Sequence, residues 1–158
     1  MKTSDIELLA QSITSGDRKA IANGITLVES TKEEDQALSE KLLNKLQASK
    51  KDSIRIGVSG PPGVGKSTFI EALGHPVLET GERLAILAID PSSSISGGSI
   101  LGDKTRMESL SRSENTFIRP SPSSGNLGGV NRSTRESISI LEAAGYSVVL
   151  VETVGVGQ

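Results

Sequence analysis

The stretch GPPGVGKST, Gly60 to Thr68, constrains the fold of this chain more than any other feature. It fits the pattern G-x-x-x-x-G-K-[ST] and lies directly between a predicted strand, IRIGVS at 54–59, and a predicted helix that begins at Lys66. In that position the loop amides and the helix dipole face the same anion, which is how such loops bind phosphate. We therefore predict an α/β fold of the P-loop NTPase type.

The residues of this loop have distinct expected roles. Glycines allow positive φ and let the backbone approach the phosphates closely. Lys66 is expected to reach the β- and γ-phosphates, and Ser67 to offer its hydroxyl to Mg²⁺. The alternative is a glycine-rich turn that binds nothing, and the loop alone does not distinguish ATP from GTP. The loop residues predicted to bind nucleotide are Gly60, Gly63, Val64, Gly65, Lys66, Ser67 and Thr68.

From Ile54 onward, short apolar runs alternate with helical stretches, and this pattern predicts a mostly parallel sheet flanked by helices. Helices at 66–73 and 133–144 fit between the strands, and the lone histidine, His75, is expected in the turn that follows the first of them. The predicted strands are 54–59, 84–89, 147–152 and, more weakly, 116–120.

The N-terminal part of the chain predicts helices joined by short breaks. It contains no proline, and its apolar residues recur at helical spacing. Thr31 and Glu34 have the spacing of a capping box that would open the third helix. We place a boundary at residue 50, so that 1–50 is a helical N-terminal extension and 51–158 is the N-terminal portion of a P-loop domain. The apolar stripes are Ile6, Leu9 and Ile13; Ile21, Ile25 and Val28; and Leu38, Leu42, Leu43 and Leu46.

Composition argues against several classes of function. The chain has 17 basic and 19 acidic residues and 2% aromatic residues, so it lacks both the positive field and the stacking surface of a nucleic-acid-binding protein. It has no cysteine, which suits a reducing cytoplasm. No apolar run is long enough to span a membrane. We expect a cytoplasmic protein with neither a nucleic-acid partner nor membrane insertion.

Acidic residues near the ends of the predicted strands provide candidate ligands for Mg²⁺ beside the phosphate loop. Asp90 ends LAILAID, Asp103 lies in the following loop, and Glu152 ends SVVLVE in the place of the usual Walker-B carboxylate. Gly155, three residues after Glu152, is expected to meet a γ-phosphate with its N–H. The alternative is that Asp90 and Glu152 only initiate turns. The predicted metal ligands are Ser67, Asp90, Asp103 and Glu152.

Four long motifs in the right order resemble the methylmalonyl-CoA mutase-associated GTPase family, whose members are also labelled arginine/ornithine (LAO/AO) transport-system kinases. The motifs are GPPGVGKST, AIDPSSSISGGSILGDKTRM, FIRPSPSSGNLGGV and VETVGVGQ, and the likeness begins at about Ile21. The resemblance implies a signal-recognition-particle-like P-loop GTPase that binds GTP, GDP and Mg²⁺. It also implies a chaperone that gates adenosylcobalamin loading and protects a cobalamin-dependent methylmalonyl-CoA mutase, and a homodimer when full length.

Carried over by position, the resemblance assigns catalytic roles to Lys66, Asp90 and Asp103, with Pro91 to Met107 as the first switch region and the second switch beginning at Glu152. Which residue orients the attacking water stays open between Asp90, Asp103 and a group near Gln158. The family reads guanine with an N-K-x-D motif that this sequence does not contain. We therefore expect an N-terminal fragment with an incomplete sheet and little GTPase activity of its own.

Two other functions fit the same sequence. One is a kinase linked to arginine or ornithine transport, which would need an acceptor site. The other is a non-catalytic binding module whose shape depends on the bound nucleotide. Release of phosphate, compared with transfer of a labelled γ-phosphate to an acceptor, distinguishes these possibilities from a GTPase.

Overall fold

The computed structural model describes residues 3–90, 107–122 and 132–154. The chain folds as two compact units: a helical unit of residues 1–53 and 132–147, and a sheet unit of residues 54–131 and 148–158. In the described ranges, no helix has the length and apolar character needed to cross a bilayer.

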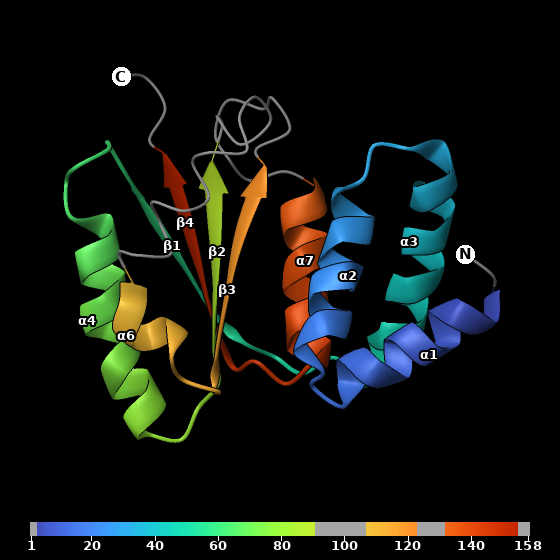
Figure 1. Cartoon of the computed structure of the whole chain (residues 1–158), viewed down its shortest axis with the longest axis horizontal. Coiled ribbons are helices and arrows are strands. Elements are labelled where there is room, and N and C mark those ends of the chain that lie inside the picture. Colours follow the sequence, from blue (N-terminus) through green and yellow to red (C-terminus); the bar gives the residue numbers. More distant parts are fainter. Residues whose placement is uncertain (1–2, 91–106, 123–131, 155–158) are drawn as a thin grey trace. The chain divides into compact units, whose positions relative to one another are not determined.

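The sheet unit is built on four parallel strands in the order β1-β4-β2-β3 (Figure 1). The two central strands are apolar and buried over most of their length, as expected where both faces of a parallel sheet are covered. In β3, Pro120 and Pro122 lack an N–H donor, and β3 lies at an edge of this sheet, where prolines are tolerated. All four predicted strands are confirmed: β1 (Ile54–Gly60), β2 (Leu84–Asp90), β3 (Thr116–Pro122) and β4 (Val148–Val154).

Helices α4 (Lys66–Glu79) and α6 (Glu108–Ser111) lie beside each other and contact the sheet (Figure 1). Their apolar side chains fill one core cluster with the central strands, so the helix that follows the phosphate loop is anchored directly to the sheet. The buried members of the cluster are Ile70, Leu84, Ile86, Met107, Leu110, Val148 and Leu150.

The predicted end of this helix at Leu73 is wrong, and so is the placement of His75 in a turn. α4 continues through His75 and Pro76 for another turn and a half. Val77 and Leu78 pack against the core cluster only because the helix continues. Partial burial of these two side chains contributes to offsetting the roughly 3 kcal/mol that a proline costs inside a helix.

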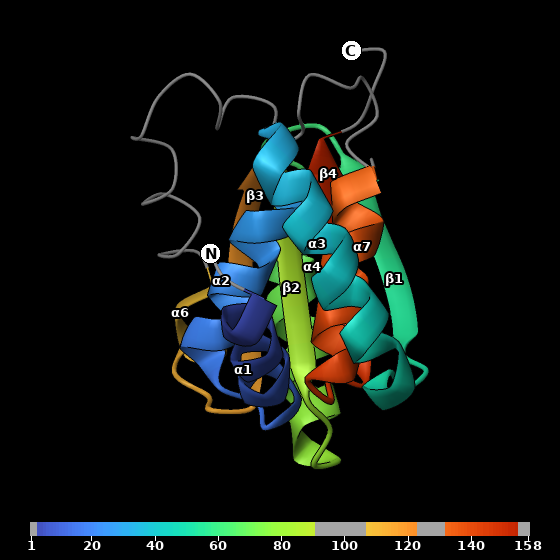
Figure 2. The same ribbon diagram turned by 90° about the vertical axis from the view of Figure 1, so that its right-hand side faces the viewer.

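The helical unit contains α1 (Thr3–Thr14), α2 (Arg18–Glu29), α3 (Glu33–Leu46), the short 3₁₀ helix η1 (Gln47–Ser49) and α7 (Arg132–Ala143). Most residues of the predicted apolar stripes lie in its interior, where Ile6, Ile21, Ile25 and Leu42 are completely buried. The exceptions are Leu9, Leu38 and Leu43, which are half-buried. α2 and α3 both pack against α7 (Figure 2). α7 follows residue 50 in the sequence, so this compact unit contains residues that the predicted N-terminal extension, 1–50, does not include. The domain boundary itself stays a prediction.

The predicted capping box at Thr31 is wrong. The N-cap residue of α3 is Lys32, which makes no side-chain capping hydrogen bond. Ser30 takes over the polar contacts at this turn, since its hydroxyl donates to Asp35 Oδ2 at 2.6 Å and accepts from the Lys32 N–H at 3.3 Å. The sequence pattern therefore located the turn but not the residue that stabilises it.

Candidate nucleotide-binding site

The phosphate-loop sequence connects β1 to α4 in the expected way. β1 ends at Gly60 and α4 begins at Lys66. Gly63 and Gly65 have φ angles of 80° and 97°, in the left-handed region that side chains with a Cβ rarely adopt, and Gly65 is the N-cap residue of α4. A Cβ built on either glycine meets no heavy atom within 4 Å, so these glycines also leave open space on the loop.

The start of α4 presents several N–H donors that no residue in the described ranges accepts from. The first helical bond runs from the Phe69 N–H to the Gly65 carbonyl at 2.9 Å. Among the described residues, none accepts a hydrogen bond from the N–H groups of Lys66, Ser67 or Thr68. Unpaired N–H groups and the positive end of the helix dipole together fit an anion with several oxygens, such as a phosphate chain.

Lys66 places its ammonium group at the loop. Its Nζ donates to the carbonyl oxygens of Gly60 at 2.8 Å and Pro61 at 3.1 Å, and it lies 3.9 Å from Glu152 Oε1. The Lys66 side chain is only 9% exposed. A cation this well buried needs partners, and here they are the loop carbonyls and one carboxylate.

Glu152 lies in β4, between Val58 of β1 and Ala88 of β2 in the register of the sheet. This position is near the carboxyl ends of three parallel strands, where ligands of open α/β sheets bind. Its side chain is 13% exposed and lies beside Lys66. The structure therefore brings the predicted Walker-B carboxylate to the phosphate loop.

Asp90 ends β2 at the same edge of the sheet, one register step past the pair of Ile89 with Thr153. Asp103, Gly155 and Gln158 lie outside the described residues, as does all of the predicted first switch except Met107, which is buried in the core. In the described part of the chain, no group of three His, Cys, Asp or Glu side chains gathers to hold a metal.

A polar contact that sequence reasoning missed joins α4 to α6. Ser109 donates a short hydrogen bond from its hydroxyl to Glu71, and its N–H also donates to Glu71 Oε1 at 3.2 Å. His75 Nε2 lies 2.9 Å from the same hydroxyl, so His75 is the donor when Ser109 donates to Glu71. The only indication of this contact in the sequence is the spacing of Glu71 and His75, which are four residues apart and therefore lie on the same face of one helix.

Comparison with known proteins gives consistent matches. The family described as "Methylmalonyl Co-A mutase-associated GTPase MeaB" matches residues 21–158, beginning where the motif resemblance was predicted to begin. The chain is 54% identical over 153 residues to "Probable GTPase Rv1496" of Mycobacterium tuberculosis, covering 97% of this chain and 46% of that protein. It is 53% identical over 153 residues to "GTPase ArgK" of Escherichia coli, covering 95% of this chain and 46% of that protein.

A relative from Mus musculus, "Methylmalonic aciduria type A homolog, mitochondrial", is 50% identical over 163 residues, covering 97% of this chain and 39% of that protein. A solved structure described as "Crystal structure of LAO/AO transport system kinase" superposes with a TM-score of 0.78 and 38% sequence identity, over 99% of this chain and 45% of that one. The chain thus spans somewhat less than half the length of these relatives.

Proposed function

Because the chain belongs to the methylmalonyl Co-A mutase-associated GTPase family, we propose that it forms the phosphate-binding part of a GTPase that serves methylmalonyl-CoA mutase. The observation that supports this most directly is the loop from Gly60 to Thr68, with a buried ammonium group and with helix-start amides that donate to none of the described residues. We propose GTP rather than ATP as the nucleotide because two of the relatives are named GTPases.

In this proposal the loop residues hold the nucleotide by electrostatics and position. The amides of Gly63 to Thr68 bind the β- and γ-phosphate oxygens. The Lys66 ammonium moves from the carbonyls of Gly60 and Pro61 to the phosphates and neutralises their charge. Phosphoryl transfer to water needs little more from a protein than such neutralisation and alignment of the nucleophile.

Ser67 and Glu152 are the described residues that would hold Mg²⁺. Ser67 offers a hydroxyl on the first turn of α4, and Glu152 a carboxylate near the carboxyl end of β4. Oxygen ligands of this kind suit Mg²⁺, which when bound withdraws charge from the phosphates. We propose Asp90 and Asp103 as further members of this network and as the catalytic carboxylates, with Gly155 as an additional phosphate contact.

For the whole protein we propose the chaperone role that the family resemblance implies: nucleotide-dependent gating of adenosylcobalamin loading and protection of the mutase. A homodimer and a cytoplasmic location belong to the same proposal. Its support is the family description, which names methylmalonyl-CoA mutase.

The name of the solved relative, a transport-system kinase, favours a second candidate. A kinase would pass the γ-phosphate to an acceptor, whereas the proposed GTPase releases it as phosphate. Incubation with γ-labelled GTP and arginine, ornithine or a cobalamin mutase separates the two, because label on an acceptor identifies the kinase.

Titration calorimetry tests the binding step. We expect GTP to give a saturable heat with Mg²⁺ and a much weaker one with EDTA, because the metal neutralises part of the phosphate charge. ATP is the matched ligand, since it carries the same triphosphate. If neither GTP nor ATP gives a Mg²⁺-dependent heat, the phosphate loop has been misassigned.

Replacing Glu152 with glutamine is expected to raise the Mg²⁺ concentration needed for half-maximal GTP binding by at least about tenfold, because glutamine lacks the negative charge that would help to hold the metal. Glu136→Gln, in α7 of the helical unit, is the matched control, because it removes the same charge from a carboxylate whose ion pair is with Arg132 of its own helix. An unchanged Mg²⁺ requirement in Glu152→Gln would remove this residue from the metal site.

A further inference from the structure

Helix α1 carries more apolar surface than the core of the helical unit uses. Ile6, Ala10 and Ile13 are buried within that unit, as one apolar stripe of a surface helix should be. Leu8 is 64% exposed, and Leu9 beside it is half-buried. A single exposed leucine needs no explanation, but these two border a groove.

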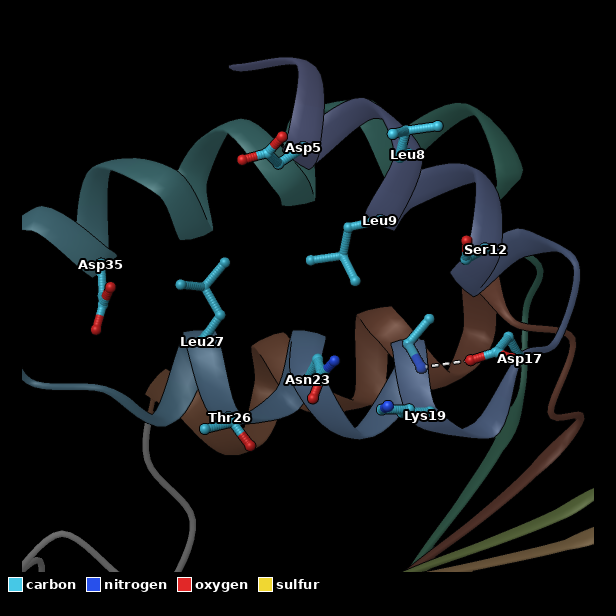
Figure 3. Close-up of a pocket in the computed structure, with 11 residues that line it drawn as sticks. Asp5, Leu8, Leu9, Ser12, Asp17, Lys19, Asn23, Thr26, Leu27 and Asp35 are labelled. Atoms are coloured by element: carbon cyan, nitrogen blue, oxygen red, sulfur yellow. Dashed lines mark hydrogen bonds between the residues drawn. The ribbon is translucent and has the colours of Figure 1, made fainter. Parts of the chain in front are cut away.

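The groove lies between α1, α2 and the start of α3 and has a volume of about 590 Å³ (Figure 3). Leu9 and Leu27 point into the space between α1 and α2, and with Leu8 they provide its apolar surface. Its lining residues run from Asp5 to Ser12 along α1 and from Lys19 to Leu27 along α2, about 10 and about 12 Å at the helical rise of 1.5 Å per residue. Its shape is therefore that of an elongated trough between two helices.

Acidic side chains lie at both ends of this trough. Asp5 and Asp35 lie near one end and Asp17 near the other, against a single lining cation, Lys19 (Figure 3). Asp17 accepts a hydrogen bond from the Ala20 N–H at 2.6 Å, and Asp35 accepts one from the Ser30 hydroxyl. Both of these hydrogen bonds come from neutral donors, and the lining as a whole has three carboxylates against one ammonium group, so its net charge is negative.

We propose that this groove docks a basic amphipathic helix of a partner protein. Apolar side chains of the partner, spaced i, i+3, i+4 and i+7, enter between Leu9 and Leu27, and its Lys or Arg residues face the terminal aspartates. The elongated shape and the apolar floor match the helix-in-groove mode of recognition, and the charge pattern selects a basic helix over an acidic one. The site shares no residue with the phosphate loop, so it does not depend on the proposed function.

A pair of designed peptides tests the proposal. The probe is a fluorescein-labelled helical peptide of about 15 residues with leucines at the spacing above and lysines at both ends, and its twin has glutamate in place of each lysine. With the full chain, fluorescence anisotropy should show saturable binding of the lysine peptide and at least about tenfold weaker binding of its twin. Raising NaCl from about 50 to about 300 mM should weaken the lysine peptide severalfold.

Two variants of α1 locate the binding. Leu8→Glu should weaken the lysine peptide by about tenfold even though it adds a negative charge, because the loss is apolar contact. Gln11→Glu adds the same charge at an exposed position outside the groove and should change the affinity less than about threefold. Far-UV circular dichroism checks that both variants are folded. Equal binding of the two peptides, no binding of either, or equal losses in both variants would overturn the proposal.

Discussion

Replacement of Lys66 with alanine is expected to weaken binding of a fluorescent GTP analogue by at least about 100-fold, if the loop binds phosphate as proposed. A unit-charge contact near 4 Å is worth on the order of 4 kcal/mol at an effective dielectric of 20, and about 1.4 kcal/mol corresponds to a factor of ten. The Lys66 side chain is only 9% exposed, so solvent screens this contact little. Fluorescence titration at fixed Mg²⁺ measures the change.

The control must separate loss of charge from loss of loop structure, because Lys66 also bonds the carbonyls of Gly60 and Pro61. The urea midpoint of Lys66→Ala shows whether the sheet unit is still stable. Lys41→Ala, at an exposed position of α3, is the matched change and should leave the affinity within about twofold. A folded Lys66→Ala variant that binds as tightly as the parent chain would contradict the assignment of the loop.

The sequence predicted the sheet well because the signal for these strands is local. β2 and β4 are continuous apolar runs, which is what burial on both faces requires, and the phosphate loop has its own pattern. β3 was the weakest prediction; the observed strand contains two prolines, which reduce strand propensity, and its edge position explains why they are tolerated. The position of Glu152 beside Lys66 followed from the rule that ligands bind at the carboxyl ends of parallel strands.

Features that depend on distant contacts were not predicted. The contact of Glu71 with Ser109 joins residues that are 38 positions apart in the sequence, and no periodic pattern of residues predicts a contact at that separation. α7 packs with helices that precede it by about a hundred residues, and no local pattern in the sequence indicates such a contact. The N-cap of α3 was missed by one residue, which is the usual uncertainty of an element boundary.

The end of α4 was missed for a reason that can be tested. Gly74 and Pro76 read as helix breakers in the sequence, yet Gly74 is buried inside the helix. A Cβ on Gly74 would lie 2.7 and 2.8 Å from the two terminal methyls of Leu110 and 3.0 Å from Leu84 Cδ2. Glycine is therefore required here by the close approach of α6 and β2 and does not mark the end of the helix.

Gly74→Val is accordingly expected to destabilise the chain by about 2–3 kcal/mol, as overpacking of a closed core does, measured by urea unfolding. Leu110 has little room to move aside, because both it and Leu84 are completely buried in the same cluster. Ala72→Val adds two methyl groups at an exposed position of the same helix and should cost only the difference in helix propensity, about 0.5 kcal/mol. Valine has a better helix propensity than glycine, so a Gly74→Val variant that unfolds at the same urea concentration as the parent chain, or at a higher one, would show that the close contact with Leu110 is not limiting. A much larger loss of stability in Gly74→Val than in Ala72→Val would show that the close packing of α4 against α6 requires a residue without a side chain at position 74.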